Sequence, residues 1–181
     1  MNHVRSRFFD SFADIDSYGS YDEVPVLLEE IDPQVHVSKA DRPQPFYLIC
    51  EKDSLLVQMS GAATIRLQHP QLRYFDTVPG DYVYIPAGTP HRIEPKQAGM
   101  IHRYKAATTQ LEGVAWYCPA CEHEVHREVW PYTQELPQAA YLRSTQAFNE
   151  SEDRRRCPRC QSVHPPVSLD GTRWSELSAQ A

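Results

Sequence analysis

Short apolar runs, separated every few residues by Pro, Gly or Asp, fill the chain from about residue 24 to residue 105. In residues 81–85 the tyrosines and the aliphatic residues alternate, and residues 64–67 show a similar alternation. Alternation with a period of two is the pattern of a strand that buries one face. Turn-forming residues at positions 79–80 and 86–90 bracket the first of these strands. The pattern therefore predicts an all-β sandwich or small barrel.

Helix is expected only in short pieces, namely residues 5–13, residues 141–148 and the end of the chain. The chain has 181 residues, which is the size of one compact domain with a small appendage. Its amino-acid composition changes near Gly113, where the apolar runs give way to a segment rich in Cys, His and Arg. We therefore predict four parts: an N-terminal segment (1–23), a β-domain (24–112), a cysteine-rich region (113–166) and a tail (167–181).

Charge and hydropathy argue against two kinds of partner. The 18 Lys and Arg residues are outnumbered by 24 Asp and Glu residues, which gives a net charge of −6. Binding to a nucleic-acid backbone needs clustered cations, so nucleic acid is not expected as a partner. No run approaches the roughly 18 apolar residues that a membrane span needs, and the first 21 residues lack the apolar core of a signal peptide. The sequence thus predicts a cytoplasmic protein with no membrane partner.

Two Cys-x-x-Cys pairs give the strongest chemical signal in the sequence. They are Cys118 with Cys121 and Cys157 with Cys160, and 35 residues separate them. Two such pairs offer four thiolates to one tetrahedral ion, at about 2.3 Å from the metal. Two disulfides, or one redox dithiol that leaves the other pair unexplained, are the alternatives. We predict an iron or zinc ion with a structural or electron-transfer role, because sulfur fills every coordination position.

A second motif ends the strand at residues 81–85. Gly80, Pro86, Gly88 and His91 follow one another with spacings that resemble the second motif of the cupin superfamily, whose His points into a small β-barrel. Pro and Gly fix the turn, so the imidazole at its end can meet a metal or a ligand at the barrel mouth. His91 is therefore a candidate metal ligand and a candidate catalytic acid or base. A packed core histidine is the alternative.

Together with the cysteines, this motif makes the chain resemble the 3-hydroxyanthranilate 3,4-dioxygenase family, a cupin barrel followed by a rubredoxin-like four-cysteine site. The resemblance covers about residues 32–166 and is carried by Trp-Tyr-Cys-Pro-Ala-Cys at 116–121, by Ser-Glu-Asp at 151–153 and by Val-His-Pro at 163–165. It implies a cupin fold, a small aromatic substrate of the aminophenol type, and a barrel iron held by two His and one Glu. By analogy with other cupins it also implies a homodimer.

The chain departs from the family pattern inside the barrel. Pairing Gln58 and Gly61 with the family's Gln and Gly, and counting back without gaps, places Leu48 at the first His and Ser54 at the Glu. Only His91 then remains of the three iron ligands. Whether the barrel holds iron is left open by the sequence.

The same gapless count assigns further positions of the barrel. Gln44 and Phe46 fall where the family has its substrate-binding Arg and an acidic residue, and Arg103 falls at a further catalytic Glu. We therefore take Gln44, Phe46, Leu48, Ser54 and Arg103 as substrate-binding candidates, and Arg103 also as a catalytic candidate. An inward Arg103 would bind a carboxylate, whereas a strand-edge Arg would reach solvent. The replaced ligands predict a more apolar interior.

Four other side chains could rebuild a metal site: His36, Cys50, Glu51 and His102. His102 and Arg103 are neighbours in a strand, so only one of them can face the barrel interior. The sequence does not say which face of its strand His36 occupies.

The sequence favours a cupin enzyme, oxidoreductase-like, that acts on an aromatic small molecule with chemistry changed from iron-dependent ring cleavage. The alternative is a non-catalytic ligand-binding cupin that has lost its barrel metal and keeps only the four-cysteine ion.

Overall fold

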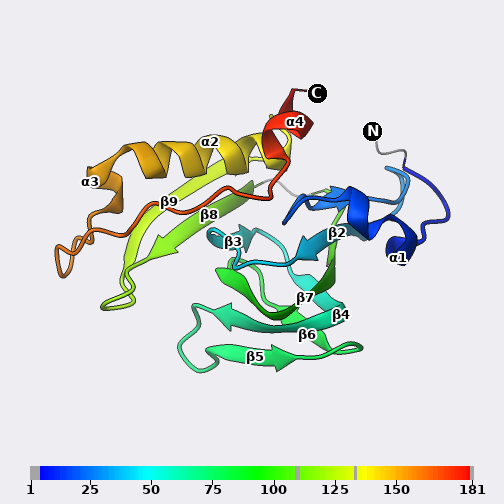
Figure 1. Ribbon diagram of the computed structural model, residues 1–181, viewed down its shortest axis with the longest axis horizontal. Helices are drawn as coiled ribbons and strands as arrows, with labels where there is room; N and C mark the ends of the chain where they lie inside the picture. Colours follow the sequence, from blue (N-terminus) through cyan, green and yellow to red (C-terminus); the bar gives the residue numbers. More distant parts are fainter. Residues whose placement is uncertain (1–4, 109–110, 133, 180–181) are drawn as a thin grey trace.

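The computed structural model describes residues 5–108, 111–132 and 134–179 (Figure 1). Within these residues, nine strands form one antiparallel sheet that curls on itself. The strands are β1 (Val24–Pro25), β2 (Gln34–Ala40), β3 (Tyr47–Cys50), β4 (Ser54–Leu67), β5 (Tyr74–Thr77), β6 (Tyr82–Ile85), β7 (His91–Lys105), β8 (Leu111–Tyr117) and β9 (Glu124–Pro131). The helices are α1 (Ser11–Asp14), the 3-10 helix η1 (Ile15–Ser17), α2 (Pro137–Glu150), α3 (Glu152–Arg155) and α4 (Trp174–Ser178). The predicted all-β domain is confirmed.

Two long strands form the centre of the barrel. β4 and β7 pair from Ser54 with Lys105 to Leu67 with His91, and irregular pairings near residues 58–63 bend both strands. A Cβ added at Gly99 would lie 2.0 Å from the carbonyl oxygen of Ser60, so the bend requires glycine there. β2 pairs with the second half of β7, whereas β3 meets its first residue. The sheet thereby wraps around an interior.

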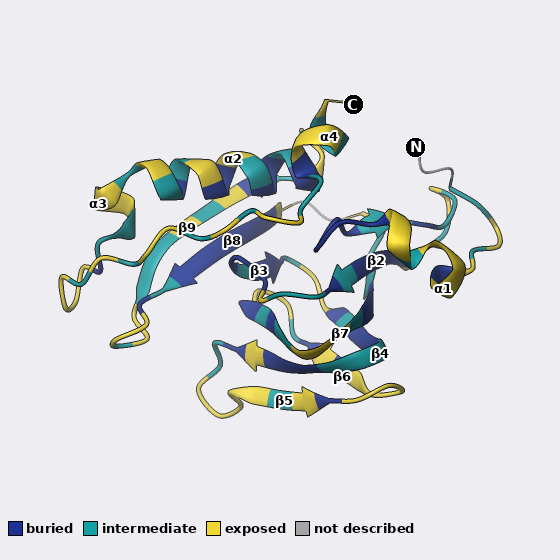
Figure 2. Ribbon diagram, in the orientation of Figure 1, coloured by how far each residue is buried: buried dark blue, intermediate teal, exposed yellow. Residues whose placement is uncertain are grey.

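Period-two burial follows the sequence pattern. In β6, Val83 and Ile85 are buried while Tyr82 and Tyr84 are exposed, as the alternation of these residues predicted. Figure 2 shows β8 as buried between its neighbours and β5 as largely exposed at the edge of the sheet. The interior is closed on one side by aromatic side chains from the sheet, α2 and α4, which include Phe46, Trp116, Tyr141, Phe148 and Trp174.

The predicted helices fare differently. Residues 141–148 lie within α2, and the tail forms α4. The helix expected at residues 5–13 is wrong for most of its length, because α1 begins only at Ser11. The Asp10 carboxylate accepts hydrogen bonds from the backbone N–H groups of Phe12 and Ala13 and so fixes the helix start. Upstream of it, Ser6 bridges to Leu27 instead.

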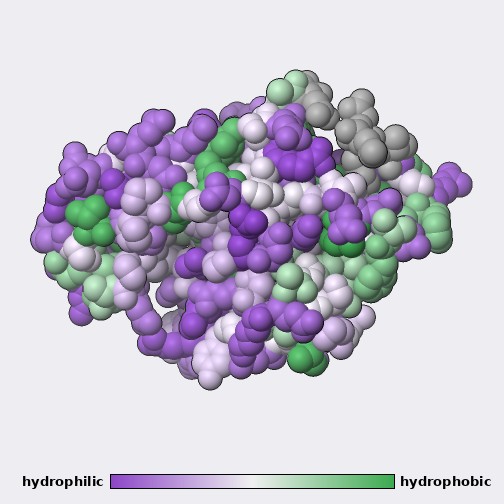
Figure 3. All heavy atoms as spheres, in the orientation of Figure 1, coloured by the Kyte–Doolittle hydropathy of each residue, from purple (hydrophilic) through white to green (hydrophobic). Residues whose placement is uncertain are grey.

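The predicted boundary between residues 112 and 113 lies inside β8, which pairs with β3 on one side and with β9 on the other. The cysteine-rich region therefore begins as a continuation of the barrel sheet, and the division into four parts stays a prediction. The face drawn in Figure 3 is largely hydrophilic with separate hydrophobic patches. In the described ranges, no helix has the length and apolar character that crossing a membrane requires.

Candidate functional site

The four cysteines of the two Cys-x-x-Cys pairs meet at one point. Their sulfur atoms all lie within 4.8 Å of one another, and Cys118 Sγ is 3.5 Å from Cys160 Sγ. Cys121 Sγ is 3.6 Å from the sulfurs of both Cys157 and Cys160. Sulfurs bound at about 2.3 Å to one tetrahedral ion would be spaced by roughly 3.8 Å. The cluster can therefore hold one metal ion, and all four thiols are free of disulfides.

Both pairs adopt the same hook. Glu122 and Gln161, which follow the second cysteine of each pair, have φ values of +57° and +64°, and each donates its N–H to the carbonyl of the first cysteine. The Ser162 hydroxyl lies 3.1 Å from Cys118 Sγ and 3.0 Å from Cys160 Sγ. This hydrogen bond is the largest influence that lowers the pKa of the Cys118 thiol, to about 6. The same hydroxyl also lowers the pKa of the Cys160 thiol, so Ser162 favours the thiolate form, which binds metal, at these two cysteines.

His91 lies inside the barrel at the start of β7. Its Nδ1 is 3.0 Å from the carbonyl oxygen of Thr89. A carbonyl only accepts hydrogen bonds, so Nδ1 carries the proton and Nε2 presents its lone pair to the interior. That lone pair contacts Nη1 of Arg103. Burial, followed by the charge of Arg103, holds the pKa of His91 well below its usual range. His91 is 0% exposed, so the expectation that it stands at a barrel mouth is wrong.

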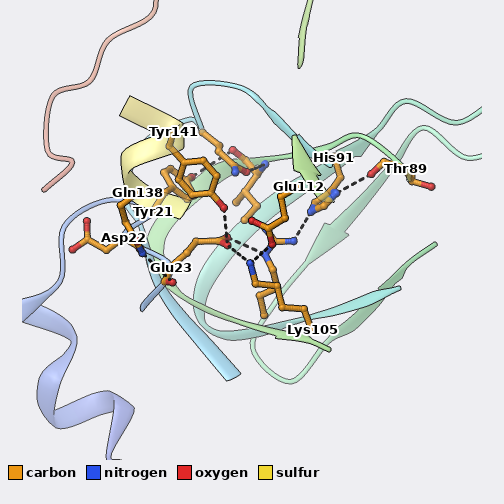
Figure 4. Close-up of polar contacts among 12 residues, drawn as sticks. Tyr21, Asp22, Glu23, Thr89, His91, Lys105, Glu112, Gln138 and Tyr141 are labelled. Carbon is orange, nitrogen blue, oxygen red and sulfur yellow. Dashed lines mark hydrogen bonds and ion pairs between the residues drawn. The ribbon is translucent and has the colours of Figure 1, made fainter. Parts of the chain in front are cut away.

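Arg103 belongs to a buried group of four charged side chains. The other three, Glu23, Lys105 and Glu112, are labelled in Figure 4. Arg103 Nε donates to Glu23 Oε1 at 2.9 Å, while Lys105 Nζ is 2.5 Å from Glu112 Oε1 and 3.9 Å from Glu23 Oε2. None of these side chains is more than 2% exposed. The structure therefore places Arg103 inside the barrel and not at a solvent-facing edge. The expectation of a more apolar interior is wrong, because this cluster lies in it.

The other substrate-binding candidates are all buried. Leu48 pairs with His91 and Val114, so it shares their inward face. Ser54 pairs with Lys105 in the same way. By contrast, Gln44 uses its side-chain oxygen to accept from the backbone N–H of Ile93.

Phe46 is occupied by packing. It stacks on Trp174 at 5.7 Å and contacts Tyr141 at 5.1 Å, measured between ring centroids. Phe46 and Gln44 thus serve packing and backbone hydrogen bonding. The substrate-binding role of the candidates stays a prediction.

Sequence reasoning missed Glu23, Lys105 and Glu112. Lys105 carried a readable signal, since it stands two positions after Arg103 in one strand and so shares its face. Glu112 pairs with Cys50 across β3 and β8, which no sequence pattern announced. Glu23 comes from the N-terminal segment, 80 residues before Arg103, and had no local signal.

The residues proposed to rebuild a metal site divide between two faces. His36 pairs with Arg103 and therefore points inward, and Cys50 belongs to the interior core. His102 pairs with Val37 and Val57 on the outer face. The Glu51 carboxylate accepts from the backbone N–H of Leu111. Among the residues that the structure describes, the four cysteines form the one group arranged to hold a metal.

The barrel residues do not fit an iron ion held by two His and one Glu. By the gapless count, Leu48 and Ser54 fall at two of the ligand positions, which stays a prediction, and the lone pair of His91 is taken by Arg103. Several inward polar atoms instead have no hydrogen-bond partner among the described residues: His36 Nδ1 and Nε2, Ser38 Oγ, Ser54 Oγ, Arg103 Nη2 and Glu112 Oε2. Buried polar atoms without partners are costly, so these atoms mark a group of unused donors and acceptors on the inward face.

Comparison with known proteins agrees with the sequence resemblance. No family model matches the chain. It is 36% identical over 93 residues to 3-hydroxyanthranilate 3,4-dioxygenase of Burkholderia cenocepacia, covering 48% of this chain and 49% of that protein. The enzyme of the same name from Brucella anthropi is 29% identical over 122 residues, covering 62% and 64%. The chain therefore spans about half to two thirds of these relatives. Its predicted resemblance to 3-hydroxyanthranilate 3,4-dioxygenases is confirmed.

Solved structures that are similar over part of the chain include dioxygenases and cupins. Hydroquinone 1,2-dioxygenase PnpCD has a TM-score of 0.47 at 20% identity, over 55% of this chain and 72% of that one. A cupin-2 domain protein from Shewanella frigidimarina has a TM-score of 0.46 at 15% identity, over 54% and 93%. The curled antiparallel sheet and the four-cysteine cluster confirm the predicted all-β class with a cysteine-rich appendage.

The buried imidazole of His36 predicts an acid-sensitive barrel. Burial, followed by the charges of Lys105 and Arg103, holds the pKa of His36 well below the ordinary value of about 6.5. The unfolded chain therefore binds a proton below pH 6.5 that the folded chain does not bind. This group's contribution to stability is complete above pH 6.5 and is lost as the pH falls. The slope is about 1.4 kcal/mol per pH unit.

A His36→Gln variant tests this expectation, because it removes one titrating group and keeps a polar side chain. The melting temperature of the variant minus that of the unaltered protein should become more positive as the pH is lowered from 7.5 to 5.5. A constant difference across this range would show that His36 is protonated alike in the folded and unfolded chains.

Proposed function

We propose that this chain is a dioxygenase-like cupin protein that acts on a small aromatic molecule inside its barrel, with chemistry that differs from iron-dependent ring cleavage. The similarity to 3-hydroxyanthranilate 3,4-dioxygenases supports the class of protein and of molecule. The difference in chemistry is supported by the contact between Arg103 Nη1 and His91 Nε2. This contact occupies the lone pair of the one remaining candidate iron ligand. The four-cysteine site is proposed to hold iron or zinc as a structural ion. A cytoplasmic homodimer stays the expectation from sequence.

Arg103 and His36 are the residues that we expect to meet the molecule. Arg103 Nη2 has no partner in the described chain and can donate to a carboxylate or hydroxyl oxygen. His36, on the neighbouring strand, pairs with Arg103 and presents its imidazole to the same inward face. The side chains of Leu48 and Ser54 would contact the same molecule from the inward face. Lys105 holds Glu112 and adds positive charge beside Arg103.

A non-catalytic binding function is the second candidate. Both ring nitrogens of His91 are engaged, Nδ1 by Thr89 and Nε2 by Arg103, so His91 has no free site for proton transfer in this arrangement. Incubation of the protein with a series of aromatic acids separates the two functions. Product detected by mass spectrometry indicates an enzyme, whereas binding without product indicates a ligand-binding cupin.

The protein should not cleave 3-hydroxyanthranilate, even after incubation with Fe(II). Enzymes commonly turn over at roughly 1 to 1,000 per second. Oxygen uptake and absorbance of the ring-opened product should both stay at the level of a protein-free control. Metal analysis should find close to one ion per chain, held by the cysteines. Rapid ring opening, or two ions per chain, would mean that the barrel assembles an iron site after Arg103 moves.

A further inference from the structure

We propose that Arg103 is a covalently attached substitute for the barrel ion, and that Glu23, supplied by the N-terminal segment, is its carboxylate partner. The inference rests on the proposed function in one respect, namely that the barrel works without iron. It adds that a guanidinium group takes over the structural role of the ion, because it links the imidazole of His91 to a carboxylate.

The geometry around His91 is that of a metal-binding histidine. In such sites the ring nitrogen that does not bind the metal typically donates to a carbonyl or carboxylate, which fixes the tautomer. Here Nδ1 makes this bond to Thr89 at 3.0 Å, and Nε2 points inward. The atom that Nε2 meets is Nη1 of Arg103. The nitrogen that would bind a metal, Nε2 of His91, thus contacts the guanidinium cation of Arg103 instead.

The buried charges around Arg103 balance one another. Arg103 and Lys105 bring two positive charges, and Glu23 and Glu112 bring two negative charges. All four are almost completely buried, where an unpaired charge would be strongly unfavourable. Glu23 reaches both cations, Arg103 Nε at 2.9 Å and Lys105 Nζ at 3.9 Å, and Tyr141 Oη is 3.5 Å from its second oxygen.

The backbone before Glu23 is shaped to deliver this carboxylate. Tyr21 and Glu23 have φ values of +54° and +47°, in the left-handed region that residues with side chains rarely adopt. Such conformations persist only when the surroundings impose them. Trp174 Nε1 donates to the carbonyl of Tyr21 at 3.0 Å, and Gln138 donates to the carbonyl of Glu23 at 3.3 Å. The helices α2 and α4 thus hold the N-terminal segment where Glu23 can meet Arg103.

A divalent ion should therefore replace the guanidinium once it is removed. Arg103→Ala leaves a space bounded by His91 Nε2 and the Glu23 carboxylate, which are both ligands that Co²⁺ accepts. The probe is Co²⁺, because bound nitrogen and oxygen ligands give it an absorption distinct from that of thiolate ligands. The matched control is Arg103→Ala/Glu23→Gln, which has the same space without the carboxylate and an unchanged four-cysteine site.

Three proteins are titrated with Co²⁺: the unaltered chain, Arg103→Ala and the double variant. We expect Arg103→Ala alone to bind one more ion per chain than the unaltered protein. Its melting temperature should rise by about 5 °C or more at a Co²⁺ concentration about 100-fold above Kd. The unaltered chain should show neither change. Folding of Arg103→Ala only in the presence of Co²⁺ would equally support the inference.

The inference is overturned if Arg103→Ala gains no ion relative to the double variant, or stays unfolded with the ion. In that case an unaltered chain with one ion and no ring cleavage still satisfies the proposed function. Ring cleavage by the unaltered chain with Fe(II) would instead contradict the proposed function, whatever the variants do. The two failures are therefore distinguishable.

Discussion

Replacing Lys105 by Met is expected to lower the free energy of unfolding by about 3–5 kcal/mol, measured by urea denaturation. Lys105 Nζ lies 2.5 Å from Glu112 Oε1, and both side chains are at most 2% exposed. Burial raises the pKa of Glu112, while the charge of Lys105 opposes that rise. Without the lysine, Glu112 loses its nearest positive charge. The folded protein must then either bury an unpaired carboxylate or bind a proton at Glu112.

Two further variants show whether the effect comes from burial. In Lys105→Met/Glu112→Leu the carboxylate is gone as well, so much of the lost stability should return, because two apolar side chains can replace a buried ion pair. Lys96→Met breaks an ion pair of similar length, 2.7 Å to Asp76, whose partners are each 55% exposed. That change should have little effect, since water solvates the remaining carboxylate. A Lys105 variant as stable as the Lys96 variant would contradict the buried network.

Replacing Cys118 or Cys160 by Ser is expected to release the four-cysteine ion and to unfold the two hooks. Binding of a structural zinc ion contributes about 10–16 kcal/mol in zinc-finger peptides, so a missing thiolate removes a large part of local stability. Cys118 and Cys157 are buried, so loss of the ion would also expose their thiols. Metal content should fall well below one ion per chain, and the melting temperature should fall with it.

Cys50 supplies the matched control. It is the fifth cysteine, it lies in the barrel core and it is not part of the metal cluster. Cys50→Ala should keep the full metal content even if its packing is slightly altered. Should Cys118→Ser retain as much metal as Cys50→Ala, the ion would have to bind elsewhere. Addition of a chelator to the unaltered protein should reproduce the cysteine effect, which tests the ion without a substitution.

These expectations concern two cation centres that the fold keeps apart. At the four-cysteine centre the chain provides four sulfur ligands that could hold an external ion. In the barrel, the chain provides both the cations and the carboxylates, so the network forms as the protein folds. The cost is that each charge depends on its partner, which is why single substitutions there are expected to be more damaging than paired ones.

Local sequence determined the features whose physical cause is local. Alternation of tyrosine and aliphatic residues set the buried face of β6, because side chains in a strand point alternately to its two sides. The Cys-x-x-Cys spacing fixed the hooks, since two intervening residues are enough to bring both sulfurs to one point. Pro86 and Gly88 shaped the turn that directs His91 inward. These predictions needed no knowledge of which strands pair.

Only the tertiary structure decided what surrounds His91. Its partner Arg103 reaches it because β7 bends, and the partner of Arg103 is Glu23, from a segment 80 residues earlier. Sequence spacing holds no information about such a contact. It forms because side chains of α2 and α4 hydrogen-bond to the backbone of the N-terminal segment and hold it against the barrel. The substitutions Leu48 and Ser54 suggested an apolar interior, whereas its charge depends on Glu23, Lys105 and Glu112. Their proximity follows from strand register and chain crossing, which are properties of the whole fold.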